Sequence, residues 1–206
     1  MFKLISEFFS LIEAIIIALV LAVLISIFVI QPYKVDGRSM EPTLEGYNQE
    51  TEQGGDHVLV FKTPFLLGGT PEFGDIVVVD SRVRNGRGWM DIILESPIVQ
   101  FLDLAGNNEA THNWIKRVIG EPGDVLEVKN GVLHRNGTAL EEEYIKEQIK
   151  EDFPPFTVPE DAVFVMGDNR NGSTDSRDVG PIPIDNVIGK VILRYYPFDR
   201  IENFLF

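Results

Sequence analysis

The sequence predicts a mainly β protein, with an N-terminal transmembrane helix followed by an extracytoplasmic antiparallel β domain. Three observations lead to this fold class. A long apolar run lies near the N-terminus, short Val- and Ile-rich segments recur behind it, and Asn-Gly pairs punctuate two of these segments. The 206 residues are enough for one domain with an appended segment, and there is no cysteine to form a disulfide or a thiolate site.

The apolar run covers residues 11–30 and is interrupted only by Glu13. At about 1.5 Å per residue, a helix of this length spans roughly 30 Å, the thickness of the hydrocarbon layer of a bilayer. A buried core helix is the alternative, but such helices are rarely apolar on every face for so long. A cleaved secretory signal would be shorter and would end at small residues, whereas this run ends in FVIQPYKV. We therefore predict an uncleaved anchor.

Charge indicates the orientation of the anchor and excludes one class of partner. Residues 1–10, predicted to be a short cytoplasmic N-terminus, contain only Lys3 as a basic residue, so the positive-inside signal is weak. The formal net charge is −14 and lies almost wholly behind the anchor, which suits an acidic domain outside the cell better than one against an anionic cytoplasmic leaflet. The same charge excludes a nucleic-acid partner, because phosphate binding needs clustered Lys and Arg.

Residues 31–206 are predicted to form the β domain. Two Asn-Gly pairs, at 130–131 and 136–137, are typical of two-residue hairpin turns. Irregular inserts are expected at about 81–112 and 137–159, and the polar stretch 141–150 is expected to be a short surface helix or an excursion without a chemical role. The predicted strands are 58–62, 75–80, 124–128, 162–166 and 187–196.

The stretch GRSMEPTL, residues 37–44, places Ser39 shortly after the anchor. A serine hydroxyl becomes a nucleophile only when a base takes its proton. None of the three histidines stands in a recognisable catalytic setting, although spacing alone leaves a Ser-His-Asp triad open. The sequence has no metal-binding motif, so we expect neither a metal nor another cofactor. The three histidines are His57, His112 and His134.

The stretch NWIKRVIGEPGD offers a different base, Lys116. Alternation along a strand would send Trp114, Lys116 and Val118 to one face. If that face is interior, loss of water lowers the pKa of Lys116, and the neutral amine can accept a serine proton. An edge lysine that prevents strand aggregation is the alternative.

A third stretch, VMGDNRNGSTDSRDVG at residues 165–180, is denser in charge and hydroxyl groups than a solvated turn requires. Two arginines and two serines interleave there with aspartates and asparagines. Such a loop can hold a site rigid through buried ion pairs, and one of its hydroxyls can orient the lysine amine.

Four blocks in order resemble the bacterial type I signal peptidases, membrane-anchored Ser/Lys endopeptidases that remove signal peptides from exported proteins. The blocks cover roughly a quarter of the chain, and their ordered combination is specific to that family. They are GRSMEPTL, GDIVVV, KRVIGEPGD and GDNRNGSTDSRDVG.

The resemblance implies a role for each matching residue. Ser39 is implied to be the nucleophile, Lys116 the general base, and Ser173 the hydroxyl that orients the lysine amine. The oxyanion is implied to be held by the backbone N–H of Ser39 and by a second donor at position 37, where one branch of the family has a serine or threonine and this chain has Gly37. The residues implied to support the site are Asp168, Arg170, Asp175 and Arg177.

The resemblance also implies the partners and location. The substrates would be preproteins whose signal peptides have small residues before the cut, acted on at the inner (plasma) membrane by a single-pass protein, with the secretion machinery as a further partner. Exposed aromatic rings would add contact with the bilayer. Two alternatives are disfavoured: a self-cleaving Ser/Lys repressor would carry a DNA-binding domain, and a non-enzymatic tethered β domain would not need the ordered blocks. The candidate membrane-contacting residues are Phe61, Phe65, Phe198, Phe204 and Phe206.

Overall fold

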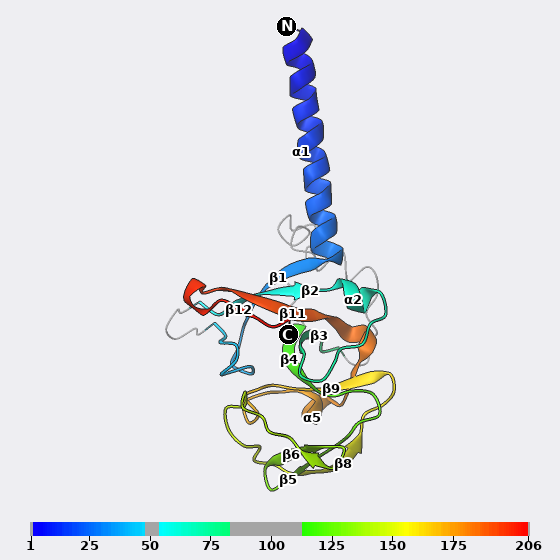
Figure 1. Cartoon of the computed structure of the whole chain (residues 1–206), viewed down its shortest axis with the longest axis vertical. Helices are drawn as coiled ribbons and strands as arrows, with labels where there is room; N and C mark the ends of the chain where they lie inside the picture. The colour runs from blue at the N-terminus through cyan, green and yellow to red at the C-terminus, as the bar shows by residue number, and fades with distance from the viewer. Residues whose placement is uncertain (1, 48–53, 83–112, 206) are drawn as a thin grey trace.

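A computed structural model describes residues 2–47, 54–82 and 113–205. It is mainly β, with one long N-terminal helix, as predicted. The helix α1, Phe2–Phe28, projects away from the β domain (Figure 1). From residue 7 to residue 26 its described side chains are mostly exposed, so it is not a core helix of this fold. Within the described residues, Glu7–Phe28 is the one helix long and apolar enough to span a bilayer.

The helix ends two residues before the predicted end of the anchor. Residue 30 already belongs to the first strand, β1 (Ile30–Lys34), which pairs with β2 (His57–Phe61). Gln31 in β1 is 5% exposed, so this end of the apolar run is covered by the β domain. The chain therefore enters the β domain directly from the helix.

The strands form two antiparallel sheets. The larger contains β1, β2, β11 (Val187–Tyr196), β3 (Ile76–Asp80), β4 (Asn113–Gly120), β9 (Ala162–Met166) and β10 (Ile182–Pro183), in that order, and β12 (Glu202–Asn203) pairs with β11. The smaller has the order β7 (Thr138–Ala139), β6 (Val132–Arg135), β5 (Val125–Lys129) and β8 (Phe153–Thr157). The remaining elements are α2 (Thr63–Leu66), α5 (Ser176–Val179), η1 (Ile184–Asn186) and η2 (Phe198–Arg200).

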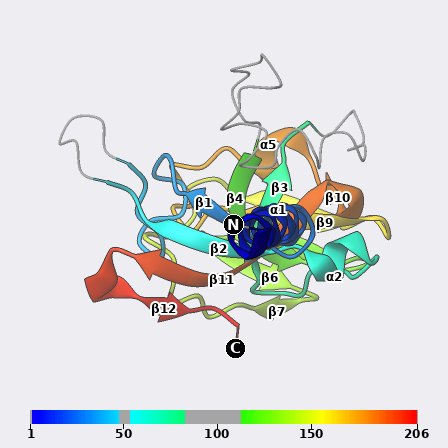
Figure 2. The same ribbon diagram turned by 90° about the horizontal axis from the view of Figure 1, so that it is seen from above.

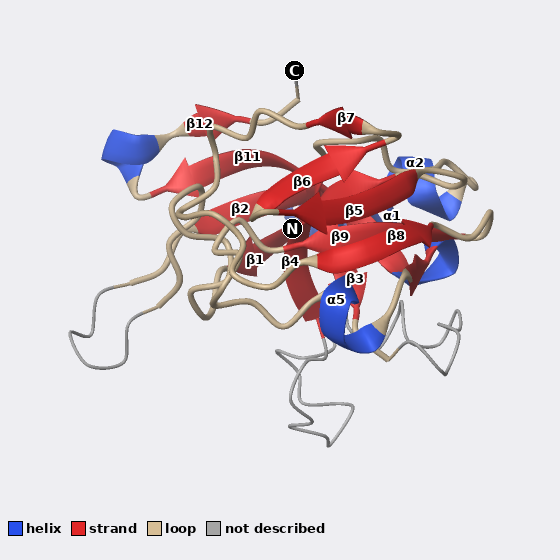
Figure 3. Cartoon of the chain, turned by 90° about the horizontal axis from the view of Figure 1, so that it is seen from below, coloured by secondary structure: helices blue, strands red, loops and turns tan. Residues whose placement is uncertain are grey.

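Both predicted Asn-Gly turns are present. Asn130 and Gly131 have φ values of 52° and 76° and connect β5 to β6, and Asn136 and Gly137 repeat this geometry between β6 and β7. Positive φ at both positions matches the right-handed twist of the paired strands. The smaller sheet that these turns build lies at the opposite end of the domain from α1 (Figures 1 and 3).

The hydrophobic core of the described residues has three parts. Two lie on opposite faces of the larger sheet, and the third lies between the two sheets. One part lies under the Ser39 turn and includes Met40 and Leu44 with Val58 and Val60. Another covers the opposite face of β3 and includes Val77 and Val118. The third joins the two sheets and includes Leu126 and Met166. Seen down α1, strands of the larger sheet surround the base of the helix (Figure 2).

The predicted insert at 137–159 is more ordered than expected, since it contains β7 and β8. Phe153 and Phe156 of β8 pack on the core between the sheets. The strand was not predicted because it contains Pro154 and Pro155, and proline is rare in strands other than edge strands. β8 is an edge strand of the smaller sheet, where proline is tolerated. Residues 141–150 form an excursion without a helix. Most of the insert predicted at 81–112 lies outside the described residues.

Candidate active site

Ser39 lies in a tight turn between β1 and the loop that leads to β2. Met40 and Leu44, 1% and 0% exposed, anchor the turn in the core, and the Leu44 N–H donates to the Met40 carbonyl at 2.9 Å. Gly37 has a φ of 77°, a conformation that favours glycine. A Cβ on Gly46 would lie 1.7 Å from the Gly37 carbonyl oxygen, so a second glycine lets the chain pack against this turn.

Lys116 occupies the middle of β4, with β3 on one side and β9 on the other. Its side chain is on the face expected from alternation, with its Nζ 5.5 Å from the centre of the Trp114 ring. The residue is 4% exposed, and its Nζ lies 2.8 Å from Ser39 Oγ. Residues 77 positions apart are thus brought to hydrogen-bond distance, and Lys116 is not an edge lysine.

Burial lowers the pKa of Lys116 from 10.5 to about 8. The nearby Asp175 and Asp168 carboxylates oppose this change, whereas the Arg177 guanidinium adds to it. Since loss of hydration is the largest cause, the apolar surroundings of β4 determine the proton affinity of the amine. A substantial fraction of Lys116 is therefore neutral near pH 8 and can accept a proton from Ser39.

Ser173 lies beside the dyad but is not hydrogen-bonded to it. Its Oγ is buried and has no hydrogen-bond partner among the residues that the structure describes. A Cβ built on Gly167 would lie 2.4 Å from both Ser173 Oγ and the Ser39 carbonyl oxygen. Gly167 therefore has to be a glycine for Ser173 to approach Ser39 so closely. The hydrogen bond expected from Ser173 to Lys116 is not formed in this arrangement.

Asp175 and Arg177 form one rigid unit at the start of α5. The buried Asp175 carboxylate accepts hydrogen bonds from the Gly167 N–H at 3.0 Å and from Arg177 Nε and Nη2, both at 2.8 Å. Arg177 Nη2 also donates to the Arg170 carbonyl at 2.6 Å. Asp175 caps α5, with Asp178 completing a capping box. The unit fixes the loop that carries Ser173.

Asp168 and Arg170 make separate buried ion pairs. Asp168 accepts two hydrogen bonds from Arg117, at 2.8 and 2.7 Å, and one from Thr43 at 2.5 Å. It thereby connects the residue after Lys116 to the turn of Ser39. Arg170 pairs with both carboxylate oxygens of Glu142, at 2.8 and 2.6 Å. All four predicted support residues are thus engaged in ion pairs, and the hydrogen bond from Arg177 to the Arg170 carbonyl joins two of these pairs.

The loop that carries Ser173 also donates hydrogen bonds to backbone carbonyls of the Ser39 turn. The Asn169 N–H donates to the Ser39 carbonyl at 3.0 Å, and Asn169 Nδ2 donates to the Arg38 carbonyl at 3.0 Å. The sequence analysis did not single out Asn169, although it lies within a quoted block. Because both bonds go to carbonyl oxygens, no side-chain pattern around Ser39 could have indicated them.

The sequence analysis also gave no role to residues 142–146, which contact Arg117, Asp168 and Glu41 around the site. The Tyr144 ring packs against the Arg117 guanidinium at 4.0 Å, and its hydroxyl donates to Glu142 at 2.7 Å. Lys146 donates through its N–H to the Asp168 carbonyl at 3.2 Å and through Nζ to Glu41 at 2.8 Å. The one signal in the sequence was an aromatic residue inside an otherwise acidic run. Through these contacts, the excursion connects β4, the loop of Asp168 and the turn of Ser39.

The described histidines lie elsewhere. His57 contacts Tyr195, with His57 Nδ1 3.4 Å from the Tyr195 hydroxyl, and His134 Nδ1 lies 3.0 Å from the Val132 carbonyl. His112 is outside the described residues. Among the described histidines neither is hydrogen-bonded to Ser39, whose Oγ contacts Lys116 instead.

Comparison with known proteins shows the family of the chain. Residues 8–196 match the family described as signal peptidase, peptidase S26. A probable signal peptidase I-1 from Synechocystis is 39% identical, and the match covers 89% of this chain and 80% of the relative. A signal peptidase I from Bacillus licheniformis is 36% identical, and the match covers 96% of this chain and 94% of the relative. A solved signal peptidase I from Enterococcus faecalis is 29% identical, covers 59% of this chain and 96% of its own, and has a TM-score of 0.42. The chain therefore belongs to the signal peptidase family, peptidase S26.

Proposed function

We propose that Ser39 and Lys116 are the catalytic dyad with which this chain performs its family's reaction, the removal of signal peptides from preproteins. The observation that carries the proposal is the 2.8 Å distance between Ser39 Oγ and the buried Lys116 Nζ. Neutral Lys116 takes the hydroxyl proton as Oγ attacks the scissile carbonyl, and an acyl-enzyme forms as the amine leaves with a proton from Lys116. Lys116 then deprotonates the water that hydrolyses the ester.

Ser173 is proposed to orient the lysine amine during this cycle. Its buried Oγ lacks a partner among the described residues and lies within about 5 Å of the Ser39 carbonyl oxygen, so it has hydrogen-bonding capacity to offer beside the dyad. Asp168, Arg170, Asp175 and Arg177 support the site through their ion pairs and do not touch the reacting atoms.

The oxyanion is proposed to be held by the backbone N–H of Ser39, with Gly37 as the second contributor. Gly37 has only its backbone to offer. Apart from the two neighbouring residues in the chain, no atom of the described residues lies within 4 Å of the position of a Cβ at this residue. A hydroxyl-bearing side chain would therefore have room there, but a φ of 77° disfavours such a residue. A backbone donor is therefore the arrangement that the Gly37 conformation favours.

The signal peptide is proposed to bind as an extended strand. β1 is an edge strand of the larger sheet and leads from α1 to the Ser39 turn. A peptide added along such an edge would place alternate side chains in shallow pockets, which suits small residues at the first and third positions before the cut. The secretion machinery, which presents preproteins at the membrane, is the proposed further partner.

The chain is proposed to be a single-pass protein of the plasma membrane with its β domain on the extracytoplasmic face. The exposed, apolar α1 and the acidic domain support this placement. Of the four described aromatic candidates for bilayer contact, Phe198 is the most exposed at 76%, whereas Phe204 packs on the core and Phe65 is partly buried. Phe61 is also partly buried, and Phe206 lies outside the described residues.

The pH dependence of cleavage tests the role of Lys116. Because the neutral amine is the reactive form and its pKa is about 8, kcat/KM for a purified preprotein should rise with pH, reach half its maximum near pH 8 and level off about one pH unit above that. The measurement is kcat/KM of the full chain in detergent between pH 5 and 10. A base with the pKa of free lysine would give a kcat/KM that is still rising steeply at pH 10, and loss of activity only below about pH 5 would indicate a carboxylate.

A further inference from the structure

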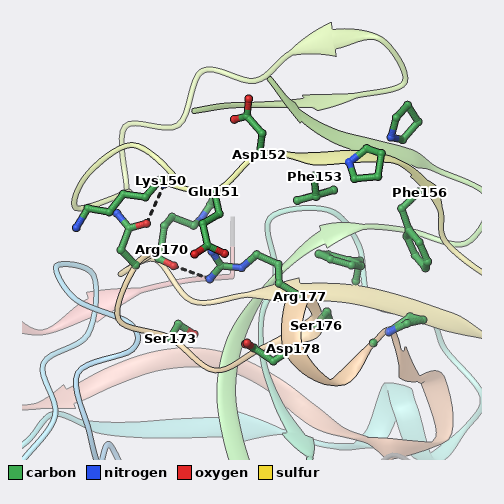
Figure 4. A pocket seen from close by; sticks show the side chains of 16 residues that line it. Lys150, Glu151, Asp152, Phe153, Phe156, Arg170, Ser173, Ser176, Arg177 and Asp178 are labelled. Carbon is green, nitrogen blue, oxygen red and sulfur yellow. Dashed lines mark hydrogen bonds between the residues drawn. The ribbon is translucent and has the colours of Figure 1, made fainter. Parts of the chain in front are cut away.

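A cavity of about 640 Å³ lies between β8 and α5 (Figure 4). Both elements lie in the part of the β domain away from α1 (Figure 1). Pockets of roughly 300–1,000 Å³ are large enough to enclose most of a small ligand. One wall consists of aromatic rings and prolines: Phe153 and Phe156 lie 6.0 and 5.7 Å from the ring of Phe164, measured between centroids. Pro154 and Pro155 line the same wall and are exposed.

The opposite wall is formed by residues of the stretch 165–180, the loop that carries Ser173. Ser173, Arg170 and Arg177 all line the cavity (Figure 4). The two arginines are already paired, with Glu142 and Asp175, and so they do not select a charged ligand. The cavity therefore offers apolar contact along one side and a preformed, rigid loop along the other.

One residue of the cavity wall, Ser173, lies next to the turn of Ser39. Ser173 Oγ and the Ser39 carbonyl oxygen each lie 2.4 Å from one point, the position of a Cβ on Gly167, so these two oxygens are within about 5 Å of each other. The wall formed by Ser173 thus begins next to the turn of Ser39. An extended peptide advances about 3.3 Å per residue, so a chain that leaves the Ser39 turn past Ser173 would run along the cavity within the first several residues after the cut.

The direction in which a substrate would run points to the same place. A signal peptide that enters from the membrane approaches the site from the end of the domain where α1 lies, and the part of the preprotein that follows the cut continues away from it. The smaller sheet lies at that far end (Figure 1), and its strand β8 forms one wall of the cavity.

We propose that this cavity binds the first residues of the mature chain, after the cut, as an extended peptide with an apolar or aromatic side chain against the rings of β8. The inference rests on the proposed function and adds to it a second substrate-binding site. Pro154 and Pro155 have no backbone N–H to donate, so recognition occurs through side chains and shape. Preproteins with an apolar residue at this distance from the cut are then the preferred substrates.

Disulfide trapping tests the position of the peptide. The chain contains no cysteine, so Glu151→Cys, at the rim of the cavity, carries the only thiol of the enzyme. In a Ser39→Ala background, a preprotein with one cysteine is scanned from three residues before the cut to twelve after it. We expect cross-linking to peak within the first several residues after the cut and to be weak before it. Glu160→Cys, equally exposed but outside the cavity, should cross-link weakly at every position.

Kinetics on two substrates provide a second readout. Pro155→Trp fills the mouth of the cavity and should raise KM for a preprotein about tenfold. It should leave kcat/KM unchanged for a peptide that ends two residues after the cut. Thr157→Trp, on the same strand but outside the cavity, should change neither substrate.

The outcomes separate the two proposals. If the unmodified chain cuts neither substrate, the proposed function fails. If it cuts both, the inference is overturned by a cross-linking peak before the cut, by cross-links that join two enzyme copies, or by equal effects of Pro155→Trp on the preprotein and the short peptide.

Discussion

Replacing Lys116 with methionine is expected to lower kcat for preprotein cleavage by at least about a thousandfold. Methionine keeps the length and apolar character of the buried stem beside Trp114, so the fold should survive. What is lost is the one group whose nitrogen lies 2.8 Å from Ser39 Oγ. The measurement is the cleavage rate of a purified preprotein by the full chain under saturating substrate.

A double substitution shows whether the two residues act as a unit. Ser39→Ala alone should cost as much as Lys116→Met, and the double variant should be no slower than either, because a nucleophile without its base contributes nothing further. Losses that multiply in the double variant would mean that Lys116 and Ser39 act independently. Unchanged thermal unfolding of each variant is the control for folding.

Replacing Glu142 with leucine is expected to destabilise the β domain by about 3–5 kcal/mol, the usual cost of removing one partner of a buried ion pair. The Arg170 side chain is 0% exposed and the Glu142 side chain 5%, so the guanidinium would stay buried without its partner. The Tyr144 hydroxyl would lose its acceptor as well. The measurement is the free energy of unfolding from denaturant titration of the full chain in detergent.

The sequence supplies a matched control for that change. Glu143→Leu alters the next glutamate of the same run, which is exposed, and should change the free energy of unfolding by less than about 0.5 kcal/mol. Similar losses in both variants would show that the Glu142–Arg170 pair does not hold the loop.

Local patterns predicted the strands well because they depend on neighbouring residues. The Asn130-Gly131 turn follows from the positive φ that these residues tolerate, and the face of Lys116 follows from alternation along β4. The long N-terminal helix was equally clear from its length and composition, although the last residues of the apolar run pair with β2 instead of continuing the helix. Each of these features can be inferred from a window of fewer than about thirty residues.

Long-range features could not be inferred in this way. Three glutamates stand together at 141–143, and only the folded chain shows that Glu142 meets a buried arginine 28 positions away. The same is true of Arg117, which follows Lys116 and reaches Asp168 from the opposite face of β4. Irregular pairing in β11, which shifts register on both of its sides, likewise depends on the neighbouring strands.

The candidate site lies between these cases. The dyad was inferred from a resemblance of four blocks, and the 2.8 Å distance between its two atoms is what folding adds. The blocks included Thr43 and Asn169 without indicating their roles, because hydrogen bonds to a carbonyl or to a distant carboxylate leave no pattern in the sequence.

The most direct test of the central claim is the mass of the products formed when a purified preprotein is incubated in lipid vesicles with the full chain or with Ser39→Ala. The unmodified chain should release two fragments whose boundary is the end of the signal peptide, and Ser39→Ala should release none. Cleavage at the same bond by Ser39→Ala at an undiminished rate would contradict the assignment of Ser39 as the nucleophile.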